Sequence, residues 1–218
     1  MAEFLTALNE VELAAFRAAG RTRRFARGEV IFHEGDDPGG VVAVLSGTVK
    51  VSVIGTGGRE VVLGFTGPGE LIGELAAVGE RARTANATAV DEVQAISVAA
   101  ADFRRFALEN PRVATLVFEH VAALLGEADR QRIDFATRDV TARIAGRLVE
   151  LAQTAGEPEA GGVRITLPLS QEELAAWSGA SREAVARSLQ LLRKLGWIET
   201  RRREIKVVDV EALRSLLE

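Results

Sequence analysis

The stretch Leu169–Ile198, LSQEELAAWSGASREAVARSLQLLRKLGWI, has the pattern of two short helices joined by a tight turn. Ser170 has the side chain of an N-cap residue, and Glu173 follows at the spacing of a capping box. Gly179 is expected to end this first helix, and Ser181 to begin the second. Two such helices, with small residues at their crossing, predict a helix-turn-helix.

The second of these helices carries polar side chains at its exposed amino-terminal end. Ser181, Arg182, Glu183 and Arg187 gather there, at the end that a recognition helix inserts into the major groove of DNA. An arginine can donate two hydrogen bonds to a guanine edge, and a glutamate can accept one from the amino group of cytosine. These four residues and Ser170 are therefore the predicted DNA-binding residues.

The segment after the second helix, Trp197–Val210, predicts a β-hairpin of the wing type with its turn around Arg201–Arg203. Between Arg164 and Lys206, nine basic residues stand against five acidic ones, whereas the whole chain has a formal net charge of −4. A local basic patch in an acidic protein favours double-stranded DNA as the partner. The alternative is a helical pair with an ordinary solvated charged face.

Residues 28–97 have a different texture, with short β-rich runs separated by glycines. Valine and isoleucine alternate with small or polar residues, and glycines stand at the expected turns, Gly35, Gly47, Gly57, Gly58 and Gly67. Several short strands at regular spacing predict a small antiparallel sandwich or barrel. Ahead of them, apolar residues at helical spacing predict a helix over Phe4–Ala19.

A long helix is predicted to begin near Asn110, because a polar cap precedes a proline that suits the first helical turn. Val117, Val121, Leu124 and Ala128 recur along it at spacings of four, three and four residues. Such a stripe is typical of a helix that pairs with a partner helix. The alternative is that it packs on the β-rich part of its own chain.

A further helix is predicted from Asp139, whose short side chain can accept hydrogen bonds from exposed amide groups. After that helix, the polar stretch Thr154–Gly162 predicts a turn rich in proline and glycine. We place the boundary between the two domains near residue 138.

The stretch Gly73–Ala87, GELAAVGERARTANA, gathers a carboxylate, a guanidinium and a hydroxyl at one predicted bend. A small cyclic phosphodiester suits this set, because Arg83 would pair with the phosphate and Thr84 would donate its hydroxyl to it. Glu74 would accept from a ribose 2′-hydroxyl, and Gly73 would let the backbone come close. The alternative is a surface ion pair between Arg83 and either glutamate of the stretch, which would contribute little energy.

Composition excludes several classes of protein. The chain has 218 residues, enough for two domains, with 47% hydrophobic and 27% charged residues, which is globular composition. It has no cysteine, which excludes disulfides, cysteine zinc sites and iron–sulfur clusters. Two histidines, His33 and His120, are too few for a histidine-rich metal site or a cupin-type enzyme. We therefore expect no metal, no enzymatic activity, no membrane partner and a cytoplasmic location.

The chain resembles the CRP/FNR family of bacterial regulators over essentially its whole length. The resemblance rests on a glycine-punctuated β-roll, a long helix and a winged SREAVARSL segment, in this order. LIGEL followed by RARTANA resembles the phosphate-binding cassette of that family, and DVTARIAGRL resembles the segment after its hinge. The resemblance implies an α+β fold with an N-terminal cyclic-nucleotide-binding, jelly-roll-like β-roll, a long dimerisation helix and a C-terminal winged helix-turn-helix. It assigns residues 1–109 to the sensor, 110–138 to the dimerisation helix and hinge, and 139–218 to DNA binding.

In functional terms, the resemblance implies a homodimeric transcription regulator. Arg182, Glu183 and Arg187 match the three base-reading positions of the family, which implies a TGTGA-like half-site in an inverted repeat. RNA polymerase is a further expected partner. Because the iron–sulfur branch of the family uses cysteines, this chain lies outside it. His120 is expected to be a partly buried structural residue rather than a haem ligand.

The resemblance also implies that a cyclic nucleotide binds at the cassette residues Gly73, Glu74, Leu75, Arg83 and Thr84. At the two positions where the cyclic-AMP-dependent members recognise the adenine amino group, the chain has Ala128 and Asp129. Alanine cannot recognise a base, whereas Asp129 could accept from the amino group of adenine or from the paired donors of guanine. We expect cyclic AMP as effector ahead of cyclic GMP. A constitutive regulator with a structural β-roll, needing no effector, is the alternative.

Overall fold

The computed structural model describes residues 4–167, 169–201 and 204–217. The chain divides into two compact units. The β-rich unit contains the residues up to Ile54 and Leu63–Ala128, and the winged-helix unit contains Gly55–Val62 and the residues from Asp129 onward. Within the described ranges, no helix has both the length and the apolar character needed to cross a membrane.

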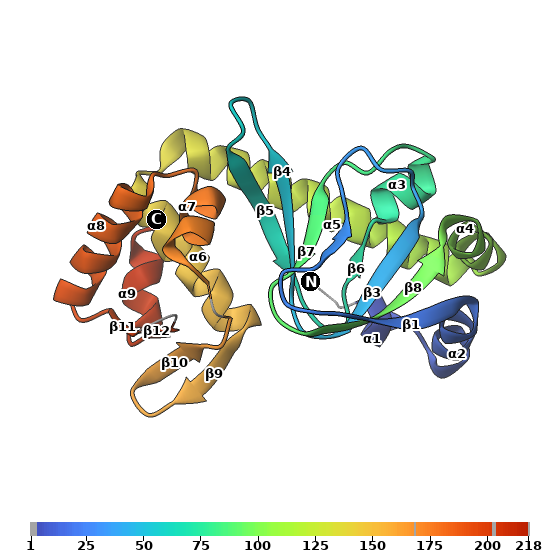
Figure 1. Ribbon diagram of the computed structural model, residues 1–218. Helices are drawn as coiled ribbons and strands as arrows, with labels where there is room; N and C mark the ends of the chain where they lie inside the picture. Colours follow the sequence, from blue (N-terminus) through green and yellow to red (C-terminus); the bar gives the residue numbers. More distant parts are fainter. Residues whose placement is uncertain (1–3, 168, 202–203, 218) are drawn as a thin grey trace. The chain divides into compact units, whose positions relative to one another are not determined.

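Two four-stranded sheets form the β-rich unit, in the strand orders β1-β8-β3-β6 and β2-β7-β4-β5 (Figure 1). Their strands are β1 Gly20–Phe25, β2 Val30–Phe32, β3 Gly40–Ser46, β4 Val49–Ile54, β5 Glu60–Thr66, β6 Leu71–Ile72, β7 Asn86–Ala89 and β8 Val93–Ala99. The predicted antiparallel β-structure is confirmed. The prediction missed β1, because this strand is rich in arginine and buries only Phe25.

Strand β3 is buried on both faces and serves two cores. Val41 and Ala43 pack in a core with helical residues such as Phe16, whereas Val42 and Val44 pack in the core between the two sheets. Successive side chains of a strand point to opposite faces, so a strand covered on both sides needs a continuous apolar run. Strand β6 pairs with β3, and this pairing fixes the start of the cassette.

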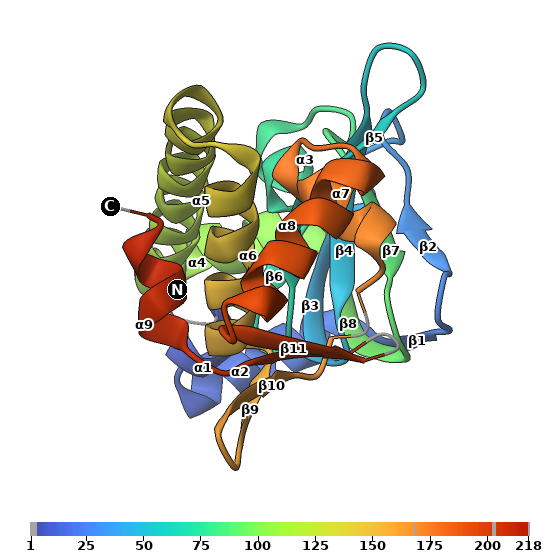
Figure 2. The same cartoon turned by 90° about the vertical axis from the view of Figure 1, so that its left-hand side faces the viewer.

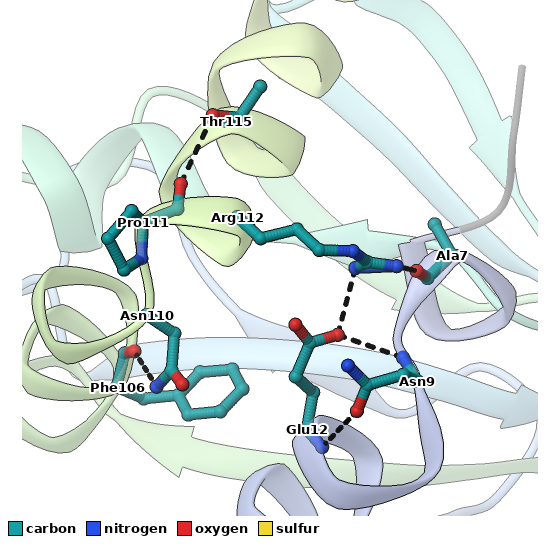
Figure 3. A network of polar contacts seen from close by, with 8 residues as sticks. All are labelled: Ala7, Asn9, Glu12, Phe106, Asn110, Pro111, Arg112 and Thr115. Carbon is teal, nitrogen blue, oxygen red and sulfur yellow. Dashed lines mark hydrogen bonds and ion pairs between the residues drawn. The ribbon is translucent and has the colours of Figure 1, made fainter.

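Two helices, α1 Phe4–Ala7 and α2 Glu10–Ala19, replace the single N-terminal helix that the sequence predicts. Asn9 separates them, because its side chain accepts from the Glu12 amide at 2.9 Å while the Glu12 carboxylate accepts from the Asn9 amide at 2.8 Å. This capping box starts a new helix even though the apolar spacing continues through it. Arg112 donates to the same carboxylate at 2.8 Å and so ties α2 to the start of the long helix (Figure 3).

Helix α4 spans Ala100–Glu109, and the long helix α5 spans Pro111–Thr137, so the predicted start of the long helix is confirmed. The predicted stripe on α5 is wrong at its first residue. Val117 is only 7% exposed and belongs to the core of the β-rich unit. Phe118 and Leu125, each one position beyond a predicted stripe residue, are 74% and 61% exposed.

In the winged-helix unit, α6 spans Val140–Thr154, and Asp139 caps it as predicted by accepting from the Ala142 amide at 2.8 Å. Strands β9 Gly156–Glu159 and β10 Gly162–Ile165 then pair antiparallel. The predicted turn is present at residues 160–161, but the prediction missed the two strands that flank it. Pairing of β10 with β12 explains the difference, because a partner distant in sequence extends the hairpin into a four-stranded sheet.

The rest of this unit is a helix-turn-helix followed by a hairpin, with the bounds α7 Gln171–Ser178, α8 Arg182–Lys194, β11 Ile198–Arg201, β12 Glu204–Val207 and α9 Val210–Ser215. Helices α7 and α8 both pack on α6, and α8 also contacts β11 (Figure 2). Strands β11 and β12 pair antiparallel as a wing requires. Two residues of the predicted wing turn, Arg202 and Arg203, lie outside the described residues.

Candidate effector and DNA sites

The cassette begins with a left-handed glycine directly after β6. Gly73 has a φ of +83°, a conformation that favours glycine. A Cβ at this position would lie 2.2 Å from Nη1 of Arg83 and 3.0 Å from the carbonyl oxygen of Gly40. Glycine is therefore required both for the turn and for the close approach of the guanidinium. Helix α3, Glu74–Gly79, starts at the next residue.

The guanidinium of Arg83 is buried, with the residue 7% exposed. Nη1 donates to the carbonyl of Gly73 at 3.0 Å, Nη2 donates to that of Gly40 at 2.7 Å, and the ring centroid of Phe32 lies 4.1 Å from Cζ. Its Nε is buried with no hydrogen-bond partner among the described residues. Burial lowers the pKa of Arg83, but a guanidinium stays protonated in proteins. Within the described residues, the hydrogen bonds of this buried cation thus go to two neutral carbonyl groups.

Glu74 is buried beside this cation and is 4% exposed. Burial raises the pKa of Glu74 to about 7, against the opposing effects of its own backbone amide and of Arg83. Its Oε2 has no hydrogen-bond partner within the described part of the chain. Oε1 lies 3.9 Å from Nε2 of His120, which is too long for a hydrogen bond. Near neutral pH this carboxyl is therefore poised between its neutral and ionised forms.

The other predicted cassette residues are open to solvent. Leu75 is 44% exposed, and Thr84 is exposed directly after Arg83. Glu80 lies 3.3 Å from Arg104 in an ion pair of its own. The alternative of a surface ion pair at Arg83 is therefore wrong, because Arg83 is buried and its hydrogen bonds go to backbone carbonyls.

Asp129 is the one predicted effector residue that belongs to the winged-helix unit, while the five cassette residues belong to the β-rich unit. Its side chain is 58% exposed and pairs with Nη1 of Arg132 at 2.9 Å, on the same helix. In this structure Asp129 thus has a local partner on α5.

The chemistry of the cassette suits an anion that also carries a hydroxyl group. An anion that reaches Arg83 would accept charge-assisted hydrogen bonds, which are stronger than neutral ones. Glu74, once ionised, would accept a hydrogen bond from a hydroxyl group. The sequence could not indicate the parts contributed by Gly40 and Phe32, which complete the surroundings of the guanidinium from β3 and β2. The sequence gives one weak hint of this arrangement, which is the position of Phe32 at the end of a β-rich run.

Two N-caps position the second candidate site. Ser170 accepts from the Glu173 amide at 3.1 Å, and the Glu173 carboxylate accepts from the Ser170 amide at 2.9 Å, so the predicted capping box is confirmed. Gly179 ends α7 with a φ of +58°. Ser181 then caps α8 by accepting from the Ala184 amide at 3.2 Å. These caps fix the turn between the two helices.

Helix α8 presents its predicted base-reading residues to solvent. Ser181, Arg182, Glu183 and Arg187 are exposed on one side, while the opposite side buries Val185, Ser188, Leu189 and Leu192. The pKa of Glu183 is lowered by its own backbone amide and the Ser181 hydroxyl, with smaller effects of Arg182 and Arg187. Glu183 is therefore an ionised acceptor between two arginines, a pattern that can match adjacent donor and acceptor edges of base pairs.

The two units together define a class of protein, in which a β-rich domain with a buried cassette arginine accompanies a winged helix-turn-helix. Comparison with known families agrees with this class. Residues 22–110 match the cyclic nucleotide-binding domain, and residues 142–216 match the Crp-like helix-turn-helix domain. The chain belongs to the CRP/FNR family, whose members are transcription regulators and not enzymes.

Relatives and solved structures support this assignment. The chain is 33% identical over 189 residues to the CRP-like cAMP-activated global transcriptional regulator of Mycobacterium tuberculosis, covering 87% of this chain and 84% of the relative. It is 29% identical to the cyclic AMP receptor protein of Thermus thermophilus, covering 95% and 92%. The solved structure of a CRP/FNR family regulator from the same organism superposes with a TM-score of 0.75 at 28% identity, covering 90% and 97%. The regulator CLP of Xanthomonas campestris shares the fold, with a TM-score of 0.81 at 24% identity and coverage of 91% and 99%.

Proposed function

We propose that this chain is a homodimeric, sequence-specific DNA-binding transcription regulator whose activity is controlled by a cyclic nucleotide. The observation that carries the effector part is the buried Arg83 guanidinium, whose Nε is unpartnered in the described part of the chain. A buried polar donor without a hydrogen-bond partner is costly, and a phosphodiester would supply both an acceptor and a negative charge. Residues 1–109 would then act as the sensor, 110–138 as the dimerisation helix and hinge, and 139–218 as the DNA-binding domain.

The effector would bind with its cyclic phosphate on Arg83 and Thr84 and with its ribose 2′-hydroxyl on Glu74. Gly73 and Leu75 would line the same pocket. Cyclic AMP stands ahead of cyclic GMP, and the two relatives described above, which are named for cyclic AMP, support that order. Cyclic GMP is the alternative effector because of Asp129, whose carboxylate matches the paired donors of guanine. A constitutive regulator with a structural β-rich unit is the second candidate.

The DNA target would be an inverted repeat of a TGTGA-like half-site. Arg182, Glu183 and Arg187 would contact base edges, while Ser170 and Ser181 would contact the backbone near the helix starts. A two-fold dimer would place its recognition helices one helical turn of DNA apart, about 34 Å. RNA polymerase would be the further partner of the DNA-bound dimer, and all these partners place its action in the cytoplasm.

The dimer would form along α5. Phe118 and Leu125 are exposed on that helix at a spacing of seven residues, and Ala122 and Ala128 are exposed beside them. Large apolar side chains at this spacing favour pairing with the same helix of a second copy. The described part of the chain leaves these side chains without cover, and a second copy would cover them.

Replacing Arg182 with alanine tests the DNA part of this proposal. The variant is expected to lose about 1–3 kcal/mol for each half-site of the TGTGA repeat, because one arginine contact to a base edge is removed from each half-site. It should also discriminate less at a single base pair. Fluorescence anisotropy on the matched repeat and on repeats changed at each position, at one fixed salt concentration, measures both effects.

The matched control for this experiment is Arg214→Ala. Arg214 lies in α9, outside the helix-turn-helix, and pairs with Glu211. This variant should bind the matched repeat as the unchanged protein does. Equal losses of the Arg182 variant on matched and unrelated DNA would contradict base recognition and would leave only non-specific phosphate binding.

A further inference from the structure

His120 brings a titratable side chain from the long helix α5 to the cassette. Its side chain is 8% exposed, and its Nε2 lies 3.9 Å from Oε1 of Glu74. Both Nε2 of His120 and Oε2 of Glu74 are buried without a hydrogen-bond partner among the described residues. Unpartnered buried polar atoms are uncommon, and each calls for an explanation. Here the two atoms belong to side chains that already face one another.

We propose that His120 is a positioning residue of the effector site, which holds the Glu74 carboxylate from α5 when a nucleotide is bound. This inference rests on the function proposed above, because it concerns the same pocket. It departs from the sequence-based expectation that His120 has only a structural role.

Without nucleotide, the surroundings of His120 and Glu74 determine which of the two side chains is protonated. Burial lowers the pKa of His120, and a hydrogen bond with the Leu71 backbone opposes this shift. A hydrogen bond raises the pKa of a histidine when the ring N–H donates it, so the Leu71 group that accepts it is the backbone carbonyl. Since Nε2 has no partner among the described residues, the donating group is Nδ1–H. The neutral ring therefore turns the lone pair of Nε2 toward Glu74. With the pKa of Glu74 near 7, the carboxyl of the pair holds a proton when the pH is below about 7.

Binding of a nucleotide would move that proton within the pair. A 2′-hydroxyl donates a stronger hydrogen bond to an ionised carboxylate than to a neutral carboxyl group, so binding favours loss of the carboxyl proton. Nε2 of His120 can take it, which converts the ring to imidazolium and leaves a carboxylate opposite. The charge-assisted contact that results would be shorter than the present 3.9 Å. No proton is lost to solvent in this exchange.

The two arginines near the pair cannot replace His120 in this role. Arg83 acts on Glu74 through its charge, and Asp36 acts in turn on Arg83. Arg104 reaches α3 from α4, where it donates to the carbonyl of Ala77 at 2.8 Å. Neither arginine accepts a proton, because a guanidinium has no acceptor site.

The direct test follows the imidazole of His120 by NMR in the full-length protein. The chain has only two histidines, and His33 is exposed, so His33 serves as the internal reference. The ring would be titrated from about pH 5 to about pH 8 in the unchanged protein, in Glu74→Gln, and in the unchanged protein saturated with cyclic AMP. We expect a neutral ring at about pH 7 without nucleotide and an imidazolium with nucleotide. Without nucleotide, Glu74→Gln should shift the titration of His120 but not that of His33.

Each outcome of this test decides a separate point. If cyclic AMP binds and His120 stays neutral, the positioning role is overturned while the nucleotide function stands. If no nucleotide binds, the function proposed above fails. The comparison with Glu74→Gln then decides the contact alone, and a titration of His120 that does not respond to the substitution overturns it.

Two substitutions at His120 add an independent readout. Glutamine can donate to the carboxylate but cannot take up the proton, so the affinity of H120Q for cyclic AMP should fall as the pH is lowered through the pKa of Glu74, about 7. The unchanged protein should show little such dependence, because the proton remains on His120. H120L loses the contact itself and should bind about tenfold more weakly even at about pH 8. His33→Gln is the control, and equal pH profiles for the unchanged protein and H120Q would overturn the proposal.

Discussion

Arg83→Met is expected to lower the affinity for cyclic AMP by about tenfold to a hundredfold, as measured by calorimetric titration. Hydrogen bonds to a charged group contribute about 1.5–3 kcal/mol each, and a phosphate bound by a guanidinium accepts at least one of them. Every 1.4 kcal/mol or so changes the affinity tenfold. The substitution also removes the donors to Gly73 and Gly40, so thermal unfolding must show that the variant is folded.

Two variants separate the role of the guanidinium from general effects of charge. Arg81 is exposed two residues away, and Arg81→Met removes the same charge from the same loop with no expected loss of affinity. Arg83→Lys keeps the charge but loses the planar fork, so its affinity should lie between those of the other two proteins. If folded Arg83→Met binds cyclic AMP within about threefold of the unchanged protein, Arg83 does not hold the phosphate.

The second large effect is expected on dimerisation, when an exposed apolar side chain of α5 is replaced by a charged one. Burying one leucine or phenylalanine side chain contributes about 1.5–3 kcal/mol, and a two-fold interface contains each residue twice. Leu125→Asp would lose that contribution on both sides and would place two carboxylates near one another. The dissociation constant of the dimer should rise on the order of a hundredfold or more, and Phe118→Asp should behave alike. Sedimentation equilibrium over a range of concentrations measures this change.

Val11→Asp is the matched control for the dimer experiment. Val11 is 79% exposed and lies on α2 rather than on α5, so the control removes an exposed apolar side chain that is not part of the proposed interface. A dimer that persists unchanged in Leu125→Asp, or a monomeric unchanged protein, would contradict pairing along α5.

Local chemistry explains which parts of the fold the sequence predicted well. Asp139 and the Ser170–Glu173 pair form their caps with residues only three positions away, so the sequence contains both partners of each bond. Asn9 and Glu12 form a capping box of the same kind. The apolar spacing of the N-terminal segment continues through it, so the sequence predicts a single helix where two exist. Capping boxes therefore deserve more weight than continuity of an apolar pattern.

Elements stabilised by distant partners were harder to predict. Strand β1 has few apolar residues and exists because it pairs along its length with β8. Strand β10 likewise depends on its pairing with β12. The stripe on α5 was misplaced at Val117 for a related reason, since the β-rich core takes up that side chain. Periodicity locates an apolar face, but the fold determines what covers it.

In the candidate effector site, too, residues close together in the sequence were predicted, whereas partners distant in the sequence were not. Gly73, Glu74 and Arg83 were predicted because one short motif contains all three. Gly40 lies 43 positions from Arg83, yet its carbonyl accepts from that guanidinium. His120 is distant from the motif as well, and only the fold places it opposite Glu74. Sequence patterns thus indicated the ligand chemistry, whereas the partners that tune the site came from the structure.

The central claim is that a cyclic nucleotide in the β-rich unit controls DNA binding by the winged-helix unit. The most direct test is fluorescence anisotropy on a labelled TGTGA inverted repeat, titrated with protein alone, with cyclic AMP and with cyclic GMP at one fixed salt concentration. A nucleotide helps only if it binds the DNA-competent state more tightly than the other state. We predict that cyclic AMP tightens DNA binding about tenfold or more, with a smaller effect of cyclic GMP. Tight DNA binding that is indifferent to both nucleotides would contradict the claim and would identify a constitutive regulator.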